Sequence, residues 1–341
     1  MSAAPDAASI EPVQMGELAC WRVRTQWAEA LIATQGAQLL SYTPHGQPPI
    51  VWLSEDAKFL RGQPLRGGVP VCWPWFGDLA RNPQSVRDMF APDAAAPAHG
   101  VVRGVDWEAG AATAEYGRVV MDFHCHMPNG SGEWKHPADL LIRFRMGESL
   151  EIELCTHNFG DAPITVSQAL HTYFAVSDSR QITIEGLEDT TYIDTMRNWE
   201  AATQTGPIRI EGETDRIYTG IDRAIDIVDP GWQRRIRIEA SQSRSAVVWN
   251  PWVEKAARLS QFADDAWQRM VCIETARVWD DVLVVAPGKT ESMSVTIRVD
   301  AAAPAAGART AGTRPAGSTD AATHSTTGAA TTTPANPAGA T

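Results

Sequence analysis

Residues 166–174 alternate between two sets of side chains with a period of two, which predicts a β-strand. Successive side chains of a strand point to opposite faces, so His171 lies among small neighbours that leave room beside it for a ligand. Residues 270–277 alternate in the same way, and Glu274 is the one large polar side chain on its face. Each predicted strand therefore presents one titratable group on an otherwise apolar surface.

A lone histidine and a lone glutamate in such positions are natural partners for general acid and base chemistry. Each also has a structural interpretation. A single histidine on a strand is more often a satisfied core or surface residue, and Glu274 could simply pair with an arginine such as Arg277. Taken singly, the structural interpretation is favoured for both, so the functional one depends on the rest of the chain.

Short apolar runs broken by turn residues recur along the chain, as in residues 18–52, and predict antiparallel strands. We expect an all-β protein with few short helices, folded as one large domain over residues 15–300. Residues 1–14 are rich in Ala, Pro and Ser and are expected to be flexible. Residues 301–341 contain almost no large apolar side chains to offset their conformational entropy, and they are expected to form a disordered tail.

Composition narrows the class of protein. With 341 residues, 44% hydrophobic and 21% charged, the chain has the composition of a soluble globular protein. Its net charge of -12 argues against nucleic acid or an anionic membrane as a partner. The five cysteines are odd in number and form no Cys-x-x-Cys pair, which favours a reducing compartment. We see no secretory signal and no apolar run near the ~20 residues that span a bilayer, so a cytoplasmic protein is expected. A monomer is expected because no interface stretch is apparent.

Two glycine-bearing segments carry arginines. In residues 64–77, Arg66 precedes two glycines that permit positive φ, and three aromatic side chains follow that could pack against a sugar. The alternative is a structural turn buried by its own aromatics. Further on, His99 and Arg103 share a second short segment closed by glycines. Two guanidinium groups on such loops suit a phosphate or carboxylate clamp, unless they are surface arginines paired with carboxylates.

A metal site is the weaker possibility. His124 and His126 alternate onto one face of a predicted strand over residues 119–127, but no third strong ligand is fixed nearby except His136. Two histidines at that spacing usually belong to a solvated face. We therefore predict no metal ligands and no cofactor.

Five motifs occur in order along the chain: Arg66-Gly-Gly-Val-Pro-Val-Cys-Trp-Pro-Trp-Phe-Gly77, His99-Gly-Val-Val-Arg103, Leu170-His-Thr-Tyr-Phe174, Trp249-Asn-Pro-Trp252 and Cys272-Ile-Glu-Thr275. Together they resemble the glucose-6-phosphate 1-epimerases, or hexose-6-phosphate mutarotases, which are relatives of the aldose 1-epimerases. The resemblance extends over roughly residues 15–299.

The resemblance implies an antiparallel β supersandwich of the galactose mutarotase type and an isomerase without cofactor or metal. It implies His171 as general acid and Glu274 as general base in ring opening and closure of a small sugar phosphate. The substrate-binding residues that it implies are Arg66, His99 and Arg103 around the phosphate and Asp215 at a sugar hydroxyl. In that mechanism the Glu274 carboxylate removes the O1 proton while the His171 imidazolium protonates the ring oxygen.

The sequence departs from the family pattern at the phosphate end. Val101 and Val102 stand where Phe and Ala are common, and Gly104 stands where Asn is usual. The connection over residues 81–98 is also longer than expected. These differences bear on ligand preference more than on the chemistry.

Three alternatives remain. An aldose 1-epimerase acting on free sugars would keep His171 and Glu274 without needing the arginine pair. A non-catalytic carbohydrate-binding β-sandwich would need only the abundant tryptophans. A metal-dependent enzyme built on His124 and His126 is the most distant.

Overall fold

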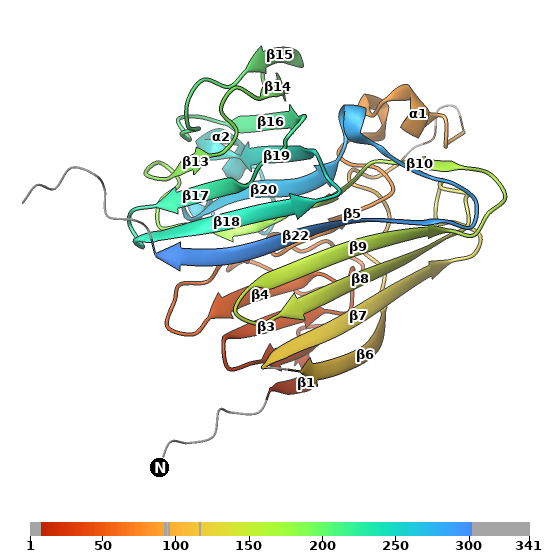
Figure 1. The fold of residues 1–341 in the computed structure, drawn as a ribbon, viewed down its shortest axis with the longest axis horizontal. Coiled ribbons are helices and arrows are strands. Elements are labelled where there is room, and N and C mark those ends of the chain that lie inside the picture. Colours follow the sequence, from red (N-terminus) through yellow and green to blue (C-terminus); the bar gives the residue numbers. More distant parts are fainter. Residues whose placement is uncertain (1–7, 92–93, 95, 116, 302–341) are drawn as a thin grey trace, which may run out of the picture. The chain divides into compact units, whose positions relative to one another are not determined.

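The structure, a computed structural model, describes residues 8–91, 94, 96–115 and 117–301. This part of the chain consists mainly of antiparallel β-strands (Figure 1), which confirms the predicted all-β class. Its helices are short: α1 (Gln84–Arg87), α2 (Trp252–Ala256) and the 3-10 helices η1 (Leu79–Arg81), η2 (Ala266–Arg269) and η3 (Trp279–Asp281). Within the described residues, no helix is long and apolar enough to cross a membrane.

One eight-stranded sheet, the site sheet, carries the candidate site. Its strands are β5 (Val71–Cys72), β11 (Gln168–Leu170), β12 (Tyr173–Ala175), β14 (Thr191–Asp194), β15 (Glu200–Thr203), β16 (Thr214–Thr219), β19 (Ser245–Asn250) and β20 (Met270–Arg277). Their order is β15-β14-β16-β19-β20-β11-β5, and β12 also pairs with β20. The strand with Glu274 therefore lies in the interior of this sheet.

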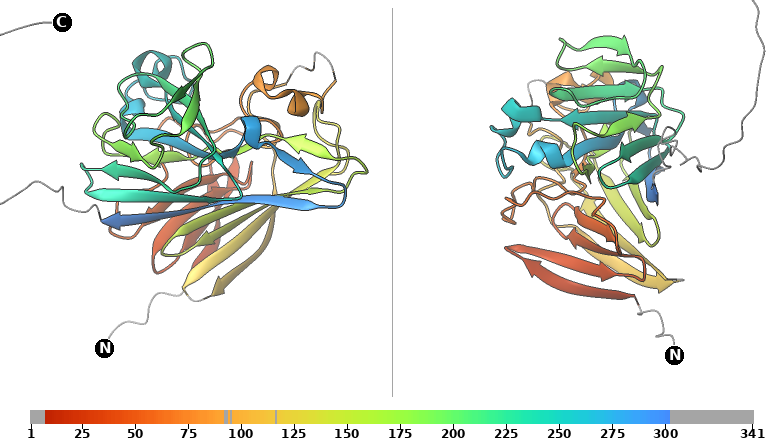
Figure 2. Two further views of the ribbon diagram at one scale, coloured as in Figure 1. Left: turned by 45° about the horizontal axis from the view of Figure 1, so that its top comes forward. Right: turned by 90° about the vertical axis from the view of Figure 1, so that its left-hand side faces the viewer.

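A second eight-stranded sheet, the long sheet, packs behind it. Its strands are β6 (Glu108–Glu115), β7 (Arg118–Met127), β8 (Ala138–Met146), β9 (Leu150–Asn158), β13 (Thr183–Glu185), β17 (Ile225–Asp229), β18 (Arg234–Ser241) and β22 (Thr290–Ala301), in the order β13-β17-β18-β22-β9-β8-β7-β6. Two smaller sheets complete the fold: β1 (Ser9–Met15), β2 (Leu18–Arg24), β3 (Ala28–Ala33) and β4 (Leu39–Pro44), and the pair β10 (Ile164–Val166) and β21 (Leu283–Val285). Figure 2 shows the sheet of β1–β4 beside the long strands β6 and β7.

Alternate side chains of β20 pack into two different apolar clusters on opposite faces of the site sheet. Val271 and Ile273 belong to the main core, together with residues of the long sheet such as Phe123 and Ile297. Cys272 and Ala276 belong to a second cluster on the opposite face of the site sheet. The main core therefore lies between the two large sheets, and Glu274, which shares the Cys272 face, points away from it.

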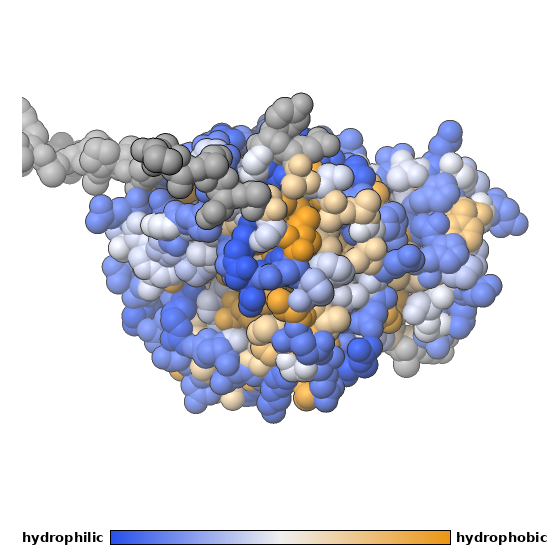
Figure 3. Space-filling model, turned by 90° about the horizontal axis from the view of Figure 1, so that it is seen from below, coloured by the Kyte–Doolittle hydropathy of each residue, from blue (hydrophilic) through white to orange (hydrophobic). Residues whose placement is uncertain are grey.

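The surface is predominantly polar on the side seen in Figure 3. Hydrophilic residues cover most of the part of this face that the described residues form, and hydrophobic residues make a narrow strip across its middle. Apolar burial is therefore directed inward, into the layers between the sheets.

Two expectations about local structure need correction. Residues 9–14 were expected to be flexible, but they lie in β1, which pairs with β2 from Ser9–Arg24 to Met15–Leu18. Ladder hydrogen bonds and the ion pair of Arg24 with Glu11 at 2.6 Å outweigh the loose composition of this stretch. Residues 1–7 and 302–341, including nearly all of the expected tail, lie outside the described residues.

The strand predicted over residues 166–174 is interrupted. Regular pairing stops at residues 171–172, where the His171 amide donates to the Pro70 carbonyl at 2.9 Å. The register nevertheless continues across the break, since Leu170 pairs with Thr275 and Tyr173 pairs with Cys272. His171 therefore still lies on the face of the sheet that the alternation predicts, despite the interruption of the strand.

Candidate active site

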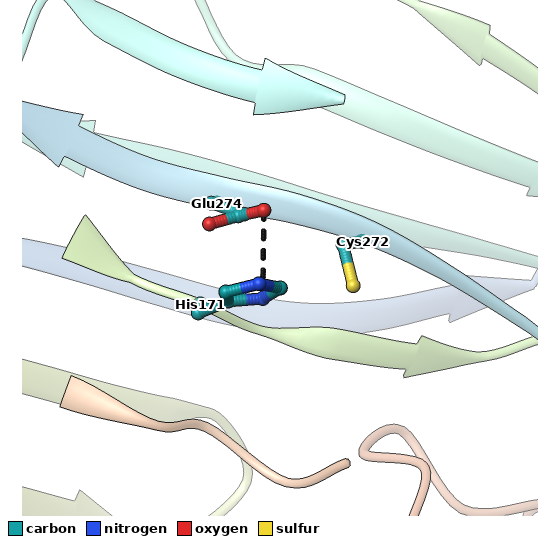
Figure 4. A group of neighbouring side chains, drawn as sticks. All are labelled: His171, Cys272 and Glu274. Atoms are coloured by element: carbon teal, nitrogen blue, oxygen red, sulfur yellow. Dashed lines mark ion pairs between the residues drawn. The ribbon is translucent and has the colours of Figure 1, made fainter. Parts of the chain in front are cut away.

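Strand register brings the two titratable residues together. With Leu170 opposite Thr275 and Tyr173 opposite Cys272, counting inward places His171 directly opposite Glu274. Directly opposite side chains have Cβ atoms ~4.5–5.5 Å apart. His171 Nδ1 lies 3.4 Å from Glu274 Oε1 (Figure 4).

Both side chains are buried and retain unused hydrogen-bonding capacity. His171 is 8% exposed and Glu274 is 1% exposed. His171 Nδ1 and Glu274 Oε2 have no hydrogen-bond partner among the described residues. The 3.4 Å contact of His171 Nδ1 is with the other carboxylate oxygen, Oε1, and it is an ion-pair contact that is not a hydrogen bond. Because buried polar atoms are nearly always paired, these atoms are available to a ligand.

Glu274 does not pair with Arg277, as its structural interpretation required. Arg277 pairs with Asp281 at 3.1 Å and donates to backbone carbonyls. Its side chain follows Glu274 by three positions on the strand and so points to the other face. Glu274 is therefore left without this cation as a partner.

Aromatic side chains fix the plane of the His171 imidazole. The Tyr173 ring stacks on it with ring centres 4.9 Å apart and an interplanar angle of 7°. Trp249 meets it edge-on at 6.1 Å, and the rings of His99 and Phe76 lie 5.4 Å and 6.5 Å away. The orientation of the imidazole is thus set by packing on several sides.

A cavity of about 420 Å³ opens onto these residues. Five of the six predicted site residues line it: Arg66, His99, His171, Asp215 and Glu274. Arg103 does not line the cavity, and its guanidinium donates to the Ala98 carbonyl at 2.8 Å. Neither Arg66 nor Arg103 forms an ion pair with a carboxylate within the described part of the chain. The catalytic and binding roles of all six residues remain predictions.

The aromatic side chains of residues 64–77 serve partly as a buried structural turn and partly as lining of the cavity. Trp73 and Trp75 are fully buried, and they pack edge-on against Trp134 and Phe90. Phe76 lines the cavity and lies 5.0 Å from the His99 ring. Most of the loop is therefore structural, and one of its three aromatic side chains faces the site.

Glycine at position 100 allows His99 to reach the site. Gly100 has φ +80, and a Cβ there would lie 1.9 Å from the Trp73 carbonyl oxygen. The Gly77 amide donates to His99 Nδ1 at 3.2 Å, so the neutral ring carries its proton on Nε2. His99 is consequently oriented as a hydrogen-bond donor through Nε2.

Sequence reasoning missed two cations that line the cavity. Arg81 of η1 lies with its guanidinium 5.3 Å from the ring centre of Trp199. Lys255 of α2 pairs with Glu213 at 2.9 Å. Both lie outside the five motifs on short helical elements, where the sequence gives no sign that they face the same cavity.

The electrostatic environment alters the proton affinity of the pair. Burial lowers the pKa of His171 well below its ordinary value, and the charges of His99, Arg103 and Arg66 lower it further. Burial and the Asp215 carboxylate raise the pKa of Glu274 well above its ordinary value. Burial, with Arg103 and Arg66, also lowers the pKa of His99 to about 3. Both shifts favour the neutral forms of the two side chains, so the imidazolium expected for His171 is disfavoured before substrate binds.

These shifts predict a pH-dependent effect of Glu274→Gln on stability. At pH values above the ordinary carboxyl pKa, a carboxyl group with a raised pKa holds more protons in the folded state than in the unfolded state. The free energy of unfolding of the wild type therefore falls as the pH rises. We expect Glu274→Gln to gain stability relative to wild type between about pH 5 and about pH 8, by at most ~1.4 kcal/mol per pH unit. Urea unfolding of both proteins across this range measures the difference, and a gain that shrinks with rising pH would contradict it.

The alternative metal site lacks convergent ligands. His124 and His126 are exposed on the outer face of β7, where His126 Nδ1 contacts Asp139. Among the described residues, the one group of three metal-ligating side chains with ligand atoms within 4.8 Å of one another is His171, Cys272 and Glu274. The two outer histidines therefore do not form such a group.

Known proteins resemble this chain over most of its length. Residues 20–298 match the family model described as aldose 1-epimerase. An Escherichia coli K12 protein named "Putative glucose-6-phosphate 1-epimerase" is 32% identical over 273 residues, covering 80% of this chain and 87% of that protein. The crystal structure of a "putative mutarotase" from Salmonella typhimurium matches with a TM-score of 0.76 at 29% identity, covering 87% of this chain and 95% of the other. A galactose mutarotase-like protein from Clostridium acetobutylicum shares the fold with a TM-score of 0.68 at 15% identity, covering 86% and 99% of the two chains.

Proposed function

The chain belongs to the aldose 1-epimerase family of isomerases, and from this premise we propose that it interconverts the α and β anomers of glucose 6-phosphate or a closely related hexose 6-phosphate. The observation that carries the proposal is the placement of His171 opposite Glu274, both with unpaired polar atoms, in a cavity that also holds Arg66. The name of the Escherichia coli relative supports the phosphorylated substrate.

Ring opening needs one group that accepts a proton and one that donates a proton. The Glu274 carboxylate takes the O1 proton while the His171 imidazolium gives a proton to the ring oxygen. The bond from C1 to the ring oxygen then breaks as the C1 carbonyl forms. After rotation about C1–C2, both proton transfers reverse and the ring closes on the other face, so the pair ends with the same single proton.

The substrate phosphate prepares the pair for this role. Before substrate binds, the arginine charges oppose protonation of His171, as described above. A phosphate with close to two negative charges bound at Arg66 offsets the charge of that arginine, which favours transfer of a proton from Glu274 to His171. Substrate binding thus converts the resting pair into the carboxylate and imidazolium that the reaction uses.

Arg66 should distinguish phosphorylated from free sugar. We expect Arg66→Gln to lower kcat/KM for glucose 6-phosphate by about 10- to 150-fold, because one charge-assisted hydrogen bond is worth ~1.5–3 kcal/mol. The rate with free glucose should change little. Steady-state measurement of anomer exchange on both sugars tests this, with Arg223→Gln at an exposed Asp222 pair as the control. Equal losses on both sugars would contradict a phosphate role.

An aldose 1-epimerase acting on free sugars is the second candidate. The observation in its favour is that Arg103 lies outside the cavity lining, which leaves the expected phosphate clamp with one arginine in contact with the cavity. Polarimetry of freshly dissolved anomers ranks the two candidates. Acceleration with glucose 6-phosphate well above that with glucose supports the proposal, and acceleration with glucose alone replaces it with the second candidate.

A further inference from the structure

A thiol lies beside the acid–base pair and has no part in the proposed mechanism. The Cys272 sulfur, a ring nitrogen of His171 and a carboxylate oxygen of Glu274 all lie within 4.8 Å of one another (Figure 4). Cys272 and Glu274 alternate onto the same face of β20, and the register puts His171 across from them. All three residues are buried, with exposed fractions of 8% for His171, 0% for Cys272 and 1% for Glu274.

Two members of this cluster lack any other partner. Nδ1 of His171 and Oε2 of Glu274 make no hydrogen bond within the described residues. Figure 4 shows the three polar ends directed toward a common region between the strands. Unpaired donor atoms that converge in a buried site fit a ligand that binds all of them, and a cation with three such ligands meets that requirement.

The donor set selects the kind of cation. Thiolate, imidazole and carboxylate together suit Zn²⁺, which binds them at ~2.0–2.3 Å, whereas Mg²⁺ and Ca²⁺ prefer oxygen alone. Adjacent ligands around such an ion lie roughly 3–4 Å apart, and the 3.4 Å separation of His171 and Glu274 already has this spacing. The adjoining cavity provides a fourth position for water.

Charge also balances in the bound state. Cys272 is fully buried, where the neutral thiol is the favoured form without a metal. A divalent cation displaces the proton of the thiol and the proton shared by the pair, and both pass to solvent. Thiolate and carboxylate then neutralise the ion, which avoids leaving a net charge in the buried site.

We propose that Cys272, His171 and Glu274 form a binding site for Zn²⁺ or a similar thiophilic divalent cation, and that its occupation inhibits the enzyme. The metal binds the same two side chains, His171 and Glu274, that exchange protons with the sugar. Metal and turnover therefore exclude each other. The inhibitory part rests on the proposed function, whereas the binding part does not.

The outer face of the long sheet offers competing metal ligands. A pocket there is lined by residues that include His124, His126, His157 and Cys155, whereas the Cys125 side chain belongs to the main core. A cation bound at this pocket would lie on the face of the long sheet turned away from the site, and so would not contact the acid–base pair. A test must therefore separate binding at Cys272 from binding at Cys155.

Cobalt binding and zinc inhibition together make that separation. Titration of the whole protein with Co²⁺ should give a thiolate-to-cobalt charge-transfer band that Cys272→Ser and Cys272→Ala abolish and Cys155→Ser retains. Cys272 does not line the cavity, so both of its variants should keep anomer exchange. Zn²⁺ should inhibit wild type and Cys155→Ser reversibly with a chelator, and inhibit the Cys272 variants at least about tenfold less strongly.

Each result has a distinct meaning. An unchanged band and unchanged inhibition in both Cys272 variants would overturn the proposed site. Loss of the band in Cys155→Ser instead would place the metal on the outer face and also overturn it. If wild type shows no anomer exchange, the proposed function fails, and the cobalt band alone still decides whether the metal site exists.

Discussion

We expect Glu274→Gln and His171→Asn each to lower anomer exchange of glucose 6-phosphate by about 10²–10⁴-fold, the contribution of one positioned acid or base. Both replacements are close in shape to the original side chains, and neither can exchange a proton near neutral pH. Because the two residues face each other at 3.4 Å, they act as one unit. The double variant should therefore lose little more than either single variant.

The measurement is the NMR exchange rate between anomers at fixed protein concentration, corrected for the spontaneous reaction. Glu239→Gln on β18 makes the same chemical change at a partly exposed carboxylate paired with Arg298, and it should retain wild-type activity. A folded Glu274→Gln or His171→Asn protein with near-normal turnover would remove that residue from the mechanism.

Arg234→Met should destabilise the protein by about 3–5 kcal/mol, because it removes a buried cation from a set of dedicated partners. Arg234 is 1% exposed, and its guanidinium donates to the carbonyls of Pro48, Pro49 and Ala175 at 2.7–3.0 Å. It also stacks over Trp232 at 4.6 Å. Each carbonyl left unsatisfied costs ~1–3 kcal/mol, which accounts for a loss of this size.

Arg235→Met is the matched control for this experiment. Arg235 is the next residue of β18, points to the opposite face, and pairs with Glu185 and Asp226 in partly exposed ion pairs. Such pairs contribute ~0–1 kcal/mol. Urea unfolding should therefore separate the two variants clearly, and equal losses would contradict the account of Arg234. Because Ala175 ends β12, the strand that continues from His171, the Arg234 variant should also lose activity at temperatures below its unfolding transition.

The sequence singled out His171 and Glu274 because each is a lone titratable group on an apolar strand, and the five motifs together pointed to their catalytic roles. Period-two alternation gives the face of each residue, but it does not give the partner strand or the register. The juxtaposition of His171 and Glu274 follows only from the pairing of β11 and β12 with β20. Asp215 reaches the same cavity through two further strand pairings, so nothing local to it could have revealed its position.

Other features depend on tertiary contacts that the sequence does not encode locally. The strand at residues 9–15 forms because β2 supplies a partner, although its composition favours a flexible segment. Arg66 and Arg103 each lie on a glycine-bearing segment within one of the five motifs. Of the two, only Arg66 lines the cavity. Burial and neighbouring charges lower the pKa of His171 and raise the pKa of Glu274, and these shifts oppose the charged forms that ordinary pKa values suggest.

The central claim is that this protein exchanges the anomers of a hexose 6-phosphate by means of His171 and Glu274. Exchange NMR of glucose 6-phosphate at anomeric equilibrium tests it most directly, with wild type, Glu274→Gln and no protein compared in one buffer. The account predicts faster exchange between the α and β H1 signals with wild type alone. Equal exchange rates in all three samples would contradict it.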